Sequence, residues 1–156
     1  MKAIRNIAIV AAAMAAFSST AIANDPMEKA IKARKGQMQL YAFNLGQLGA
    51  MAKGEVAYDA AAATAAANNL LAVVTLDAMS MWPQGSDSTA MPGKTRAKVE
   101  AWTTWPEIGK KSEAMTAAAQ QMAAAAGGGL DSLKGAMGEV GKGCKGCHET
   151  YREEKK

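Results

Sequence analysis

Three side chains with reactive atoms lie within five residues near the end of this 156-residue chain. Cys144 and Cys147 are its only cysteines, and His148 is its only histidine. If the segment is helical, residues three and four positions apart share one face, so both thiols and the imidazole project together. Such a set could form a redox pair, bind a metal ion or attach a cofactor.

These chemistries differ in what else they need. A structural disulfide suits an exported protein but leaves the adjacent His148 without a role. A thioredoxin-like redox pair needs a βαβ context with a helix that begins at the motif, and no strand pattern precedes it here. A zinc site needs a fourth ligand, which would have to be an acid or a water molecule because the chain has no further Cys or His.

Residues 144–148 read C-K-G-C-H, and C-x-x-C-H is the attachment signature of haem c. The two thiols can add to the two vinyl groups of one haem, and His148 is then the proximal iron ligand. We therefore predict one covalently bound haem c. A second histidine of the same chain is excluded as the sixth ligand, so that position is left to Met, Lys, Asn, an exogenous molecule or nothing.

The start of the chain has the pattern of an export signal. Lys2 and Arg5 form a short basic region, residues 7–17 are uncharged and apolar, and residues 21–23 fit a small-residue cleavage site. The apolar run is short for a membrane span, which needs about 20 residues. We predict that residues 1–23 are cleaved as a general secretory signal and that residues 24–156 form one periplasmic domain, the compartment in which bacteria attach haem c.

Charge and composition exclude several functions. Without Lys2 and Arg5, 16 of the 18 basic residues remain against 14 acidic ones, a net charge of +2. That charge does not indicate nucleic-acid binding. No long apolar segment follows residue 23, so no membrane span is expected in the mature chain. A second histidine and a nucleophile–base pair are both absent from the sequence, so we do not expect an enzyme.

Four helices should hold the motif, because alanine, the best helix former, is abundant. The first is expected to begin at the Asn-Asp-Pro of residues 24–26, to end at 53–55, and to bury one seam. The second should follow an Asp59 cap over residues 60–78, the third a capping box at residues 104–107, and the fourth should run from about residue 131 to Tyr151. The seam of the first helix comprises Met27, Ile31, Arg34, Met38, Tyr41, Leu45, Leu48 and Ala52.

Helices joined by short loops predict an all-α, antiparallel four-helix bundle. Its seams are rich in Ala and Met with little aromatic bulk, so the core leaves space unless a ligand such as haem fills it. The last helix also contains glycines, each of which costs about 1 kcal/mol relative to Ala and permits close approach of a flat group. These glycines are Gly135, Gly138, Gly141, Gly143 and Gly146.

A helical chain with this motif near its C-terminus resembles the class II c-type cytochromes, the cytochrome c′ family, over nearly the whole mature chain. The resemblance rests on "IKARKGQMQ" (31–39), "GAMAKGEVAYDAAA" (49–62), Trp82 at the end of the second helix and "LKGAMGEVGKGCKGCHETYREE" (133–154). It implies the thioether and proximal-ligand roles given above for the C-terminal motif.

The resemblance also implies roles for residues outside the motif. Arg34, with Lys35 beside it, should lie near a haem propionate, and Arg152 should flank the proximal side. From the residues alone, a buried Arg34 needs an anion, which is either a propionate or an acid of the bundle. Trp82 and Tyr41 could pack on the macrocycle or could be ordinary core aromatics.

The family is divided at the position that Met38 occupies. Five-coordinate, high-spin members leave the iron open beneath an apolar residue, which in some is Met, whereas low-spin relatives bind a Met sulfur. The stretch "NLGQLGAMAKGE" (44–55) resembles the low-spin group. We therefore expect His148 and Met38 to hold the iron of an electron carrier that serves redox partner proteins. The alternative is a five-coordinate cytochrome c′ that binds NO or CO at an open distal site. Many members dimerise, so a homodimer is a further expectation.

Overall fold

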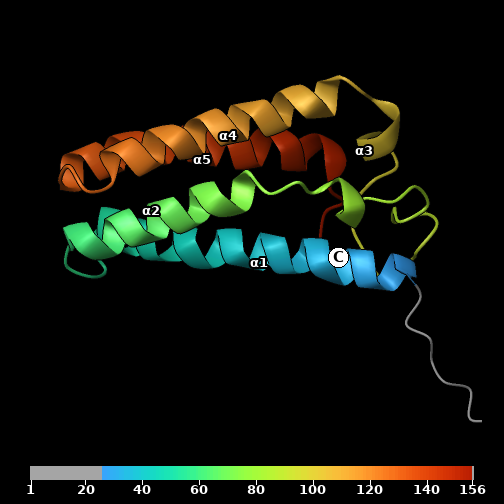
Figure 1. Ribbon diagram of the computed structural model, residues 1–156, viewed down its shortest axis with the longest axis horizontal. Helices are drawn as coiled ribbons and strands as arrows, with labels where there is room; N and C mark the ends of the chain where they lie inside the picture. The colour runs from blue at the N-terminus through green and yellow to red at the C-terminus, as the bar shows by residue number, and fades with distance from the viewer. Residues whose placement is uncertain (1–25, 156) are drawn as a thin grey trace, which may run out of the picture.

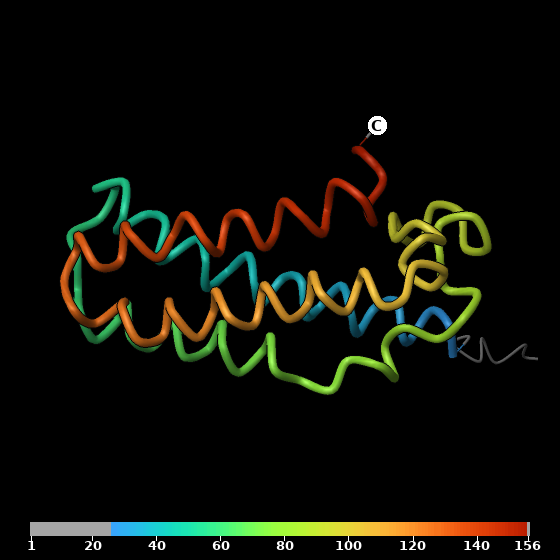
Figure 2. Tube along the Cα trace, turned by 90° about the horizontal axis from the view of Figure 1, so that it is seen from above, coloured from blue at the N-terminus to red at the C-terminus, as the bar shows by residue number. Residues whose placement is uncertain are grey.

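The computed structural model describes residues 26–155, and in this range the chain folds into four long helices (Figure 1). Helices α1 and α2 form one layer and α4 and α5 the other, and the four run side by side along the long axis (Figure 2). The predicted all-α four-helix bundle is confirmed. The expected signal, residues 1–23, lies outside the described residues. The elements are α1 Pro26–Lys53, α2 Ala60–Val74, the 3-10 helix η1 Met79–Met81, α3 Glu100–Thr103, α4 Glu107–Ala125 and α5 Leu130–Tyr151.

Small apolar side chains fill most of the interior. Leu48, Leu70 and Met122 are fully buried between the helices. Around them lie alanines of α2 and α4, whose short side chains let the two helices approach closely. These alanines are Ala63, Ala66, Ala67, Ala118 and Ala119. Within residues 26–155, none of the helices combines the length and the apolarity that a membrane span requires.

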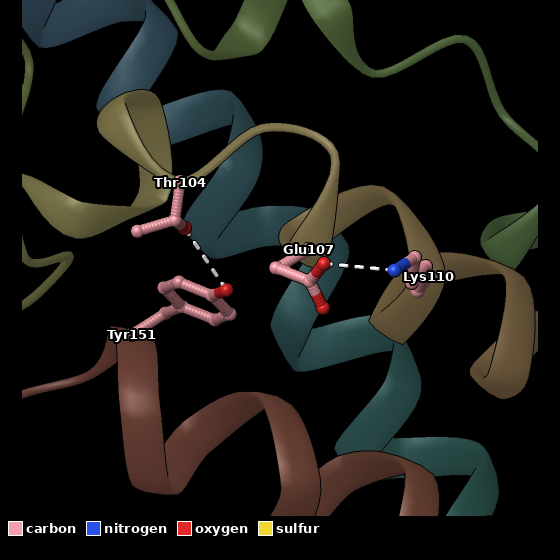
Figure 3. A network of polar contacts seen from close by, with 4 residues as sticks. All are labelled: Thr104, Glu107, Lys110 and Tyr151. Carbon is pink, nitrogen blue, oxygen red and sulfur yellow. Dashed lines mark hydrogen bonds and ion pairs between the residues drawn. The ribbon is translucent and has the colours of Figure 1, made fainter.

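One of the two predicted helix caps is confirmed and the other is wrong. Asp59 caps α2, and its carboxylate accepts a backbone N–H of the first turn at 2.8 Å. The expected capping box of α4 does not form (Figure 3). The Thr104 hydroxyl instead donates to the Tyr151 hydroxyl at 3.0 Å, and the Glu107 carboxylate accepts from Lys110 at 2.8 Å. Thr104 thus has a partner from a distant part of the chain, and Glu107 pairs within its own helix.

Helix α2 ends at Val74 and not at the predicted residue 78. The last carbonyls of a helix lack intrahelical partners, and here side chains satisfy them. The Thr75 hydroxyl donates to the Leu71 carbonyl at 2.9 Å. The Gln37 amide of α1 donates to the Val73 carbonyl at 3.1 Å. These two bonds fix where the helix stops.

The buried seam of α1 differs from the predicted one at a single important position. Gln37 is buried, with 6% of its surface exposed, whereas Met38 is 37% exposed. The expectation that Met38 lies on the seam is wrong, because the Gln37 amide turns inward to reach the end of α2. The buried residues of α1 are Ile31, Arg34, Gln37, Asn44, Leu48 and Met51.

Candidate haem site

Cys144, Cys147 and His148 lie in the last two turns of α5, and all three are half-buried. Both thiols are free, so they form no disulfide. Residues 26–155 contain no group of three or more His, Cys, Asp or Glu side chains that could hold a metal ion. Two free thiols and one imidazole on a helical face match what haem c requires, and they do not match a zinc site.

Side chains of two other helices adjoin the thiols. Met115 of α4 places its Sδ atom 4.0 Å from Cys144 Sγ. Burial, and then the charges of the two thiols, raise the pKa of Tyr41 of α1 to about 12. Burial also raises the pKa of the Cys144 and Cys147 thiols. The thiols are therefore neutral at pH 7, a setting that fits an apolar macrocycle better than a bare metal ion, which binds thiolates.

A glycine beside Cys144 brings α4 and α5 into close contact. A Cβ atom at Gly143 would lie 3.0 Å from Met115 Sδ and 3.3 Å from Met115 Cα. A side chain at position 143 would therefore push the two helices apart. Three other glycines of α5 would meet nothing within 4 Å, so no close approach requires them; these are Gly135, Gly138 and Gly141.

Two arginines lie near His148. Burial, followed by the charges of Arg152 and Arg96, lowers the pKa of His148. The imidazole is then neutral at pH 7, which is the form that binds iron. The Arg152 backbone N–H also donates to the His148 carbonyl at 3.2 Å. Arg152 was expected on this side, whereas Arg96 was not, because it lies in an irregular segment that carries no periodic pattern.

Arg34 is buried, with 3% of its surface exposed, and the bundle supplies its partners. The guanidinium donates to Ser86 Oγ at 2.7 Å, to the Ser86 carbonyl and to Thr95 Oγ1 at 2.8 Å. It also stacks over the Trp82 ring, 4.7 Å from the centroid, as cations do on aromatic faces. Lys35 beside it is exposed. The propionate role of Arg34 and Lys35 stays a prediction, and the recorded contact of Trp82 is with the arginine.

Met38 lies at the level of His148. Helices α1 and α5 run antiparallel (Figure 1), and a Cβ atom at Gly49 of α1 would lie 3.8 Å from Met137 of α5. Met38 lies as far before Gly49 in the sequence as His148 lies after Met137. The register therefore brings Met38 to the level of His148.

Known proteins share this arrangement. Residues 29–152 match the family model described as Cytochrome C′. A cytochrome c-554 of Cereibacter sphaeroides is 42% identical over 133 residues, which cover 81% of this chain and 95% of the relative. A cytochrome c′ of the same species is 37% identical over 144 residues, 92% of this chain and 95% of the relative. The solved cytochrome c′ from Rhodobacter spheriodes has a TM-score of 0.80 at 37% identity and covers 83% of this chain and 98% of its own.

These matches overturn one expectation. The electron carrier with a low-spin iron held by His148 and Met38 is wrong, because the matching family is that of cytochromes c′, which are high-spin, gas-binding haem proteins. The short stretch 44–55 suggested the low-spin group, but the match to cytochromes c′ spans residues 29–152. The cofactor is one covalently attached haem c. The chain belongs to the cytochrome c′ family.

Proposed function

We propose that this protein holds one haem through Cys144, Cys147 and His148 and binds a small gas such as NO or CO at the open distal side of a five-coordinate iron. When bound, the haem supplies an iron atom with a free coordination position. A relative supports the class of ligand: a variant of the cytochrome c prime from Alcaligenes xylosoxidans, 31% identical with a TM-score of 0.73, was solved as a nitric oxide complex.

Three side chains of α5 hold the haem on its proximal side, and two arginines keep one of them neutral. The thiols of Cys144 and Cys147 form the thioether links, and the neutral imidazole of His148 donates to iron. Arg152 and Arg96, which lower the pKa of His148, disfavour its protonation and so keep it available as a ligand.

The observation that carries the open distal side is the match of residues 29–152 to the Cytochrome C′ family model. The Gln37 amide of α1 is turned inward and bonds to the Val73 carbonyl, and Met38 is its neighbour in sequence. The flexible, unbranched side chain of Met38 suits a cover that moves aside for a gas.

Gas binding is tested by titration of the reduced holoprotein with CO. We expect a high-spin ferrous spectrum that converts fully to a CO adduct with one haem per chain. A reduced protein that takes up no CO would contradict the proposal. A Met122→Leu variant is the control. Met122 is a fully buried core methionine, so its replacement leaves the haem site intact and the variant should take up as much CO as wild type.

We also propose export to the periplasm with cleavage after residue 23. The A-x-A pattern at residues 21–23 supports it. Intact mass measurement of protein from a periplasmic fraction should show a chain that begins at Asn24 and carries one haem. A full-length chain recovered from the cytoplasm with haem attached would contradict it.

A second copy of this chain is the partner that the outer face of α1 and α2 fits best. Phe43 is 67% exposed and Val56 52%, beside a hollow of about 560 Å³ that both help to line. A cytochrome c′ that is 32% identical, with a TM-score of 0.76, was solved with a ligand-controlled dimer dissociation. In a two-fold dimer each Phe43 can enter the partner's hollow. Light scattering should show that Phe43→Glu is monomeric and that Leu76→Glu, at another exposed position, is not.

A further inference from the structure

Residues 82–99 form an irregular segment that lies at the end of the bundle where α1 begins and α5 ends (Figure 1). The segment connects η1 to α3, encloses Arg34 of α1 and pairs with the residues that follow α5. Within it, Thr95 bonds both to Arg34 and to the backbone N–H of Ala97, which takes part in that pairing. No sequence pattern singled out this residue, and the haem-attachment motif does not include it.

On the α1 side, the segment encloses Arg34. Ser86 is fully buried and Thr95 is 8% exposed, and both side chains accept hydrogen bonds from the guanidinium at 2.7 and 2.8 Å. The rings of Trp82 and Trp102 lie 4.7 and 5.5 Å from its central carbon. Arg34 is one turn before Met38, so this enclosure fixes the part of α1 that carries the distal residue.

On the α5 side, the segment pairs with the residues that follow the helix. The Lys98 N–H donates to the Tyr151 carbonyl and the Glu153 N–H to the Arg96 carbonyl, both at 2.9 Å. The Ser88 hydroxyl donates to the Glu153 carboxylate at 2.7 Å. This short pairing begins one turn after His148, so it fixes the end of the helix that carries the proximal ligand.

Thr95 joins the two sides through one oxygen atom. Thr95 Oγ1 accepts a hydrogen bond from Arg34 at 2.8 Å and another from the Ala97 N–H at 3.1 Å. Ala97 is the antiparallel bridge partner of Arg152, and the bonds of that bridge are the two between residues 96–98 and residues 151–153. Thr95 therefore bonds both to Arg34 of α1 and to the backbone of the segment that pairs with the end of the proximal helix.

We infer that Thr95 is a positioning residue that ties the distal helix to the proximal helix and thereby restrains gas binding. The inference rests on the proposed function. A gas that enters on the distal side has to displace Met38, and Arg34 holds that part of α1 to the chain after His148 through Thr95. Without the tie, the start of α1 is held less firmly to the chain after α5, so the distal side opens more easily and a change there reaches the proximal ligand less strongly.

The test compares three variants of the reduced holoprotein. Thr95→Val keeps the shape but removes the acceptor, Thr95→Ser keeps the acceptor, and Thr116→Val removes a hydroxyl that bonds only within α4. The readouts are the CO association rate and the iron–histidine stretching frequency in resonance Raman spectra. We expect Thr95→Val to raise the rate at least about fivefold and to shift the frequency, while the two controls stay within about twofold of wild type and leave it unchanged.

The outcomes separate this inference from the function on which it rests. A Thr95→Val protein that melts earlier but keeps the wild-type rate and frequency would show that Thr95 only stabilises the fold. A wild-type protein that takes up no CO would refute the proposed function, whereas a wild-type protein that takes up CO while Thr95→Val keeps its rate and frequency would refute this inference alone. If Thr95→Val does not yield folded holoprotein, Thr95→Ala removes the same acceptor with a smaller side chain and has to change both readouts in the same direction, or the inference fails.

Discussion

Replacement of Gly143 by Ala should destabilise the protein, although the same replacement elsewhere in α5 should stabilise it. The new Cβ atom would lie 3.0 Å from Met115 Sδ and 3.3 Å from Met115 Cα. The sulfur atom can rotate away, but the Cα atom belongs to the backbone of α4. The two helices therefore have to separate next to Cys144.

The size of the effect follows from two opposing terms. Alanine in a helix interior is favoured over glycine by about 1 kcal/mol. Overpacking typically costs about 1–3 kcal/mol, and contact with backbone belongs to the upper part of that range. Gly143→Ala should therefore lower the free energy of unfolding by about 1–2 kcal/mol. Gly141→Ala is the matched control, because its Cβ atom would meet nothing within 4 Å, and it should raise that free energy by about 0.5–1 kcal/mol.

Thermal unfolding of the two holoproteins measures the difference directly. For a domain of this size, we expect the melting temperature of Gly143→Ala to lie about 5–10 °C below that of Gly141→Ala. Far-ultraviolet circular dichroism follows the helices, and the visible spectrum checks that both variants carry the same amount of haem. If Gly143→Ala melts at or above the wild-type temperature, the contact between α4 and α5 is not close enough to require glycine.

Three further predictions concern side chains away from the iron. Arg34→Met should lower the free energy of unfolding by about 2–4 kcal/mol, since it leaves the buried hydroxyls of Ser86 and Thr95 without their donor; a loss below about 1 kcal/mol in denaturant titrations would contradict this. Tyr58→Phe removes bonds of 2.8 and 3.0 Å to the turn between α4 and α5, so it should cost about 1–2 kcal/mol without altering the visible spectrum, and an altered spectrum would count against it. The pKa of Asp87 is lowered from its usual value of 3.8, first by a hydrogen bond from a backbone N–H of the following turn. The stability that ionised Asp87 contributes is therefore complete above pH 3.8 and is lost as the pH falls through the lowered pKa in the folded protein. The melting temperature of Asp87→Asn should decline less below about pH 4 than that of wild type, and equal declines would refute this linkage.

The helices and the haem motif could be predicted because their signals are local. Abundant alanine indicates the helices themselves. The Asp59 cap marks the start of α2, and the glycines at residues 127–129 lie between the end of α4 and the start of α5. The attachment motif occupies five consecutive residues, and helical geometry alone places its thiols and imidazole on one face. Nothing distant in the chain is needed to read either feature.

Features that depend on distant residues could not be predicted. Arg34 takes its partners from Ser86 and Thr95, about fifty positions away in a segment without periodicity. Thr104 has the right neighbours for a capping box, but its hydroxyl lies 2.8 Å from the Glu100 carbonyl and 3.0 Å from the Tyr151 hydroxyl at the end of the chain. Tertiary contacts of this kind override local propensity.

The buried seam of α1 differs from the predicted one by a single residue. A helical period of 3.6 does not distinguish Gln37 from Met38 as the inward position. The Val73 carbonyl at the end of α2 favours Gln37, whose amide donates to it at 3.1 Å beside the Tyr41 hydroxyl at 3.4 Å, whereas a methionine side chain has no donor for it.

The most direct test of an open distal side is the coordination state of the reduced wild-type iron, measured by resonance Raman spectroscopy beside a Met38→Ala variant. An iron held by His148 alone predicts five-coordinate, high-spin marker bands in both proteins, with an iron–histidine stretch at the same frequency. Six-coordinate, low-spin bands in the wild type that become five-coordinate in Met38→Ala would contradict it and would show that the methionine sulfur is bound to the iron.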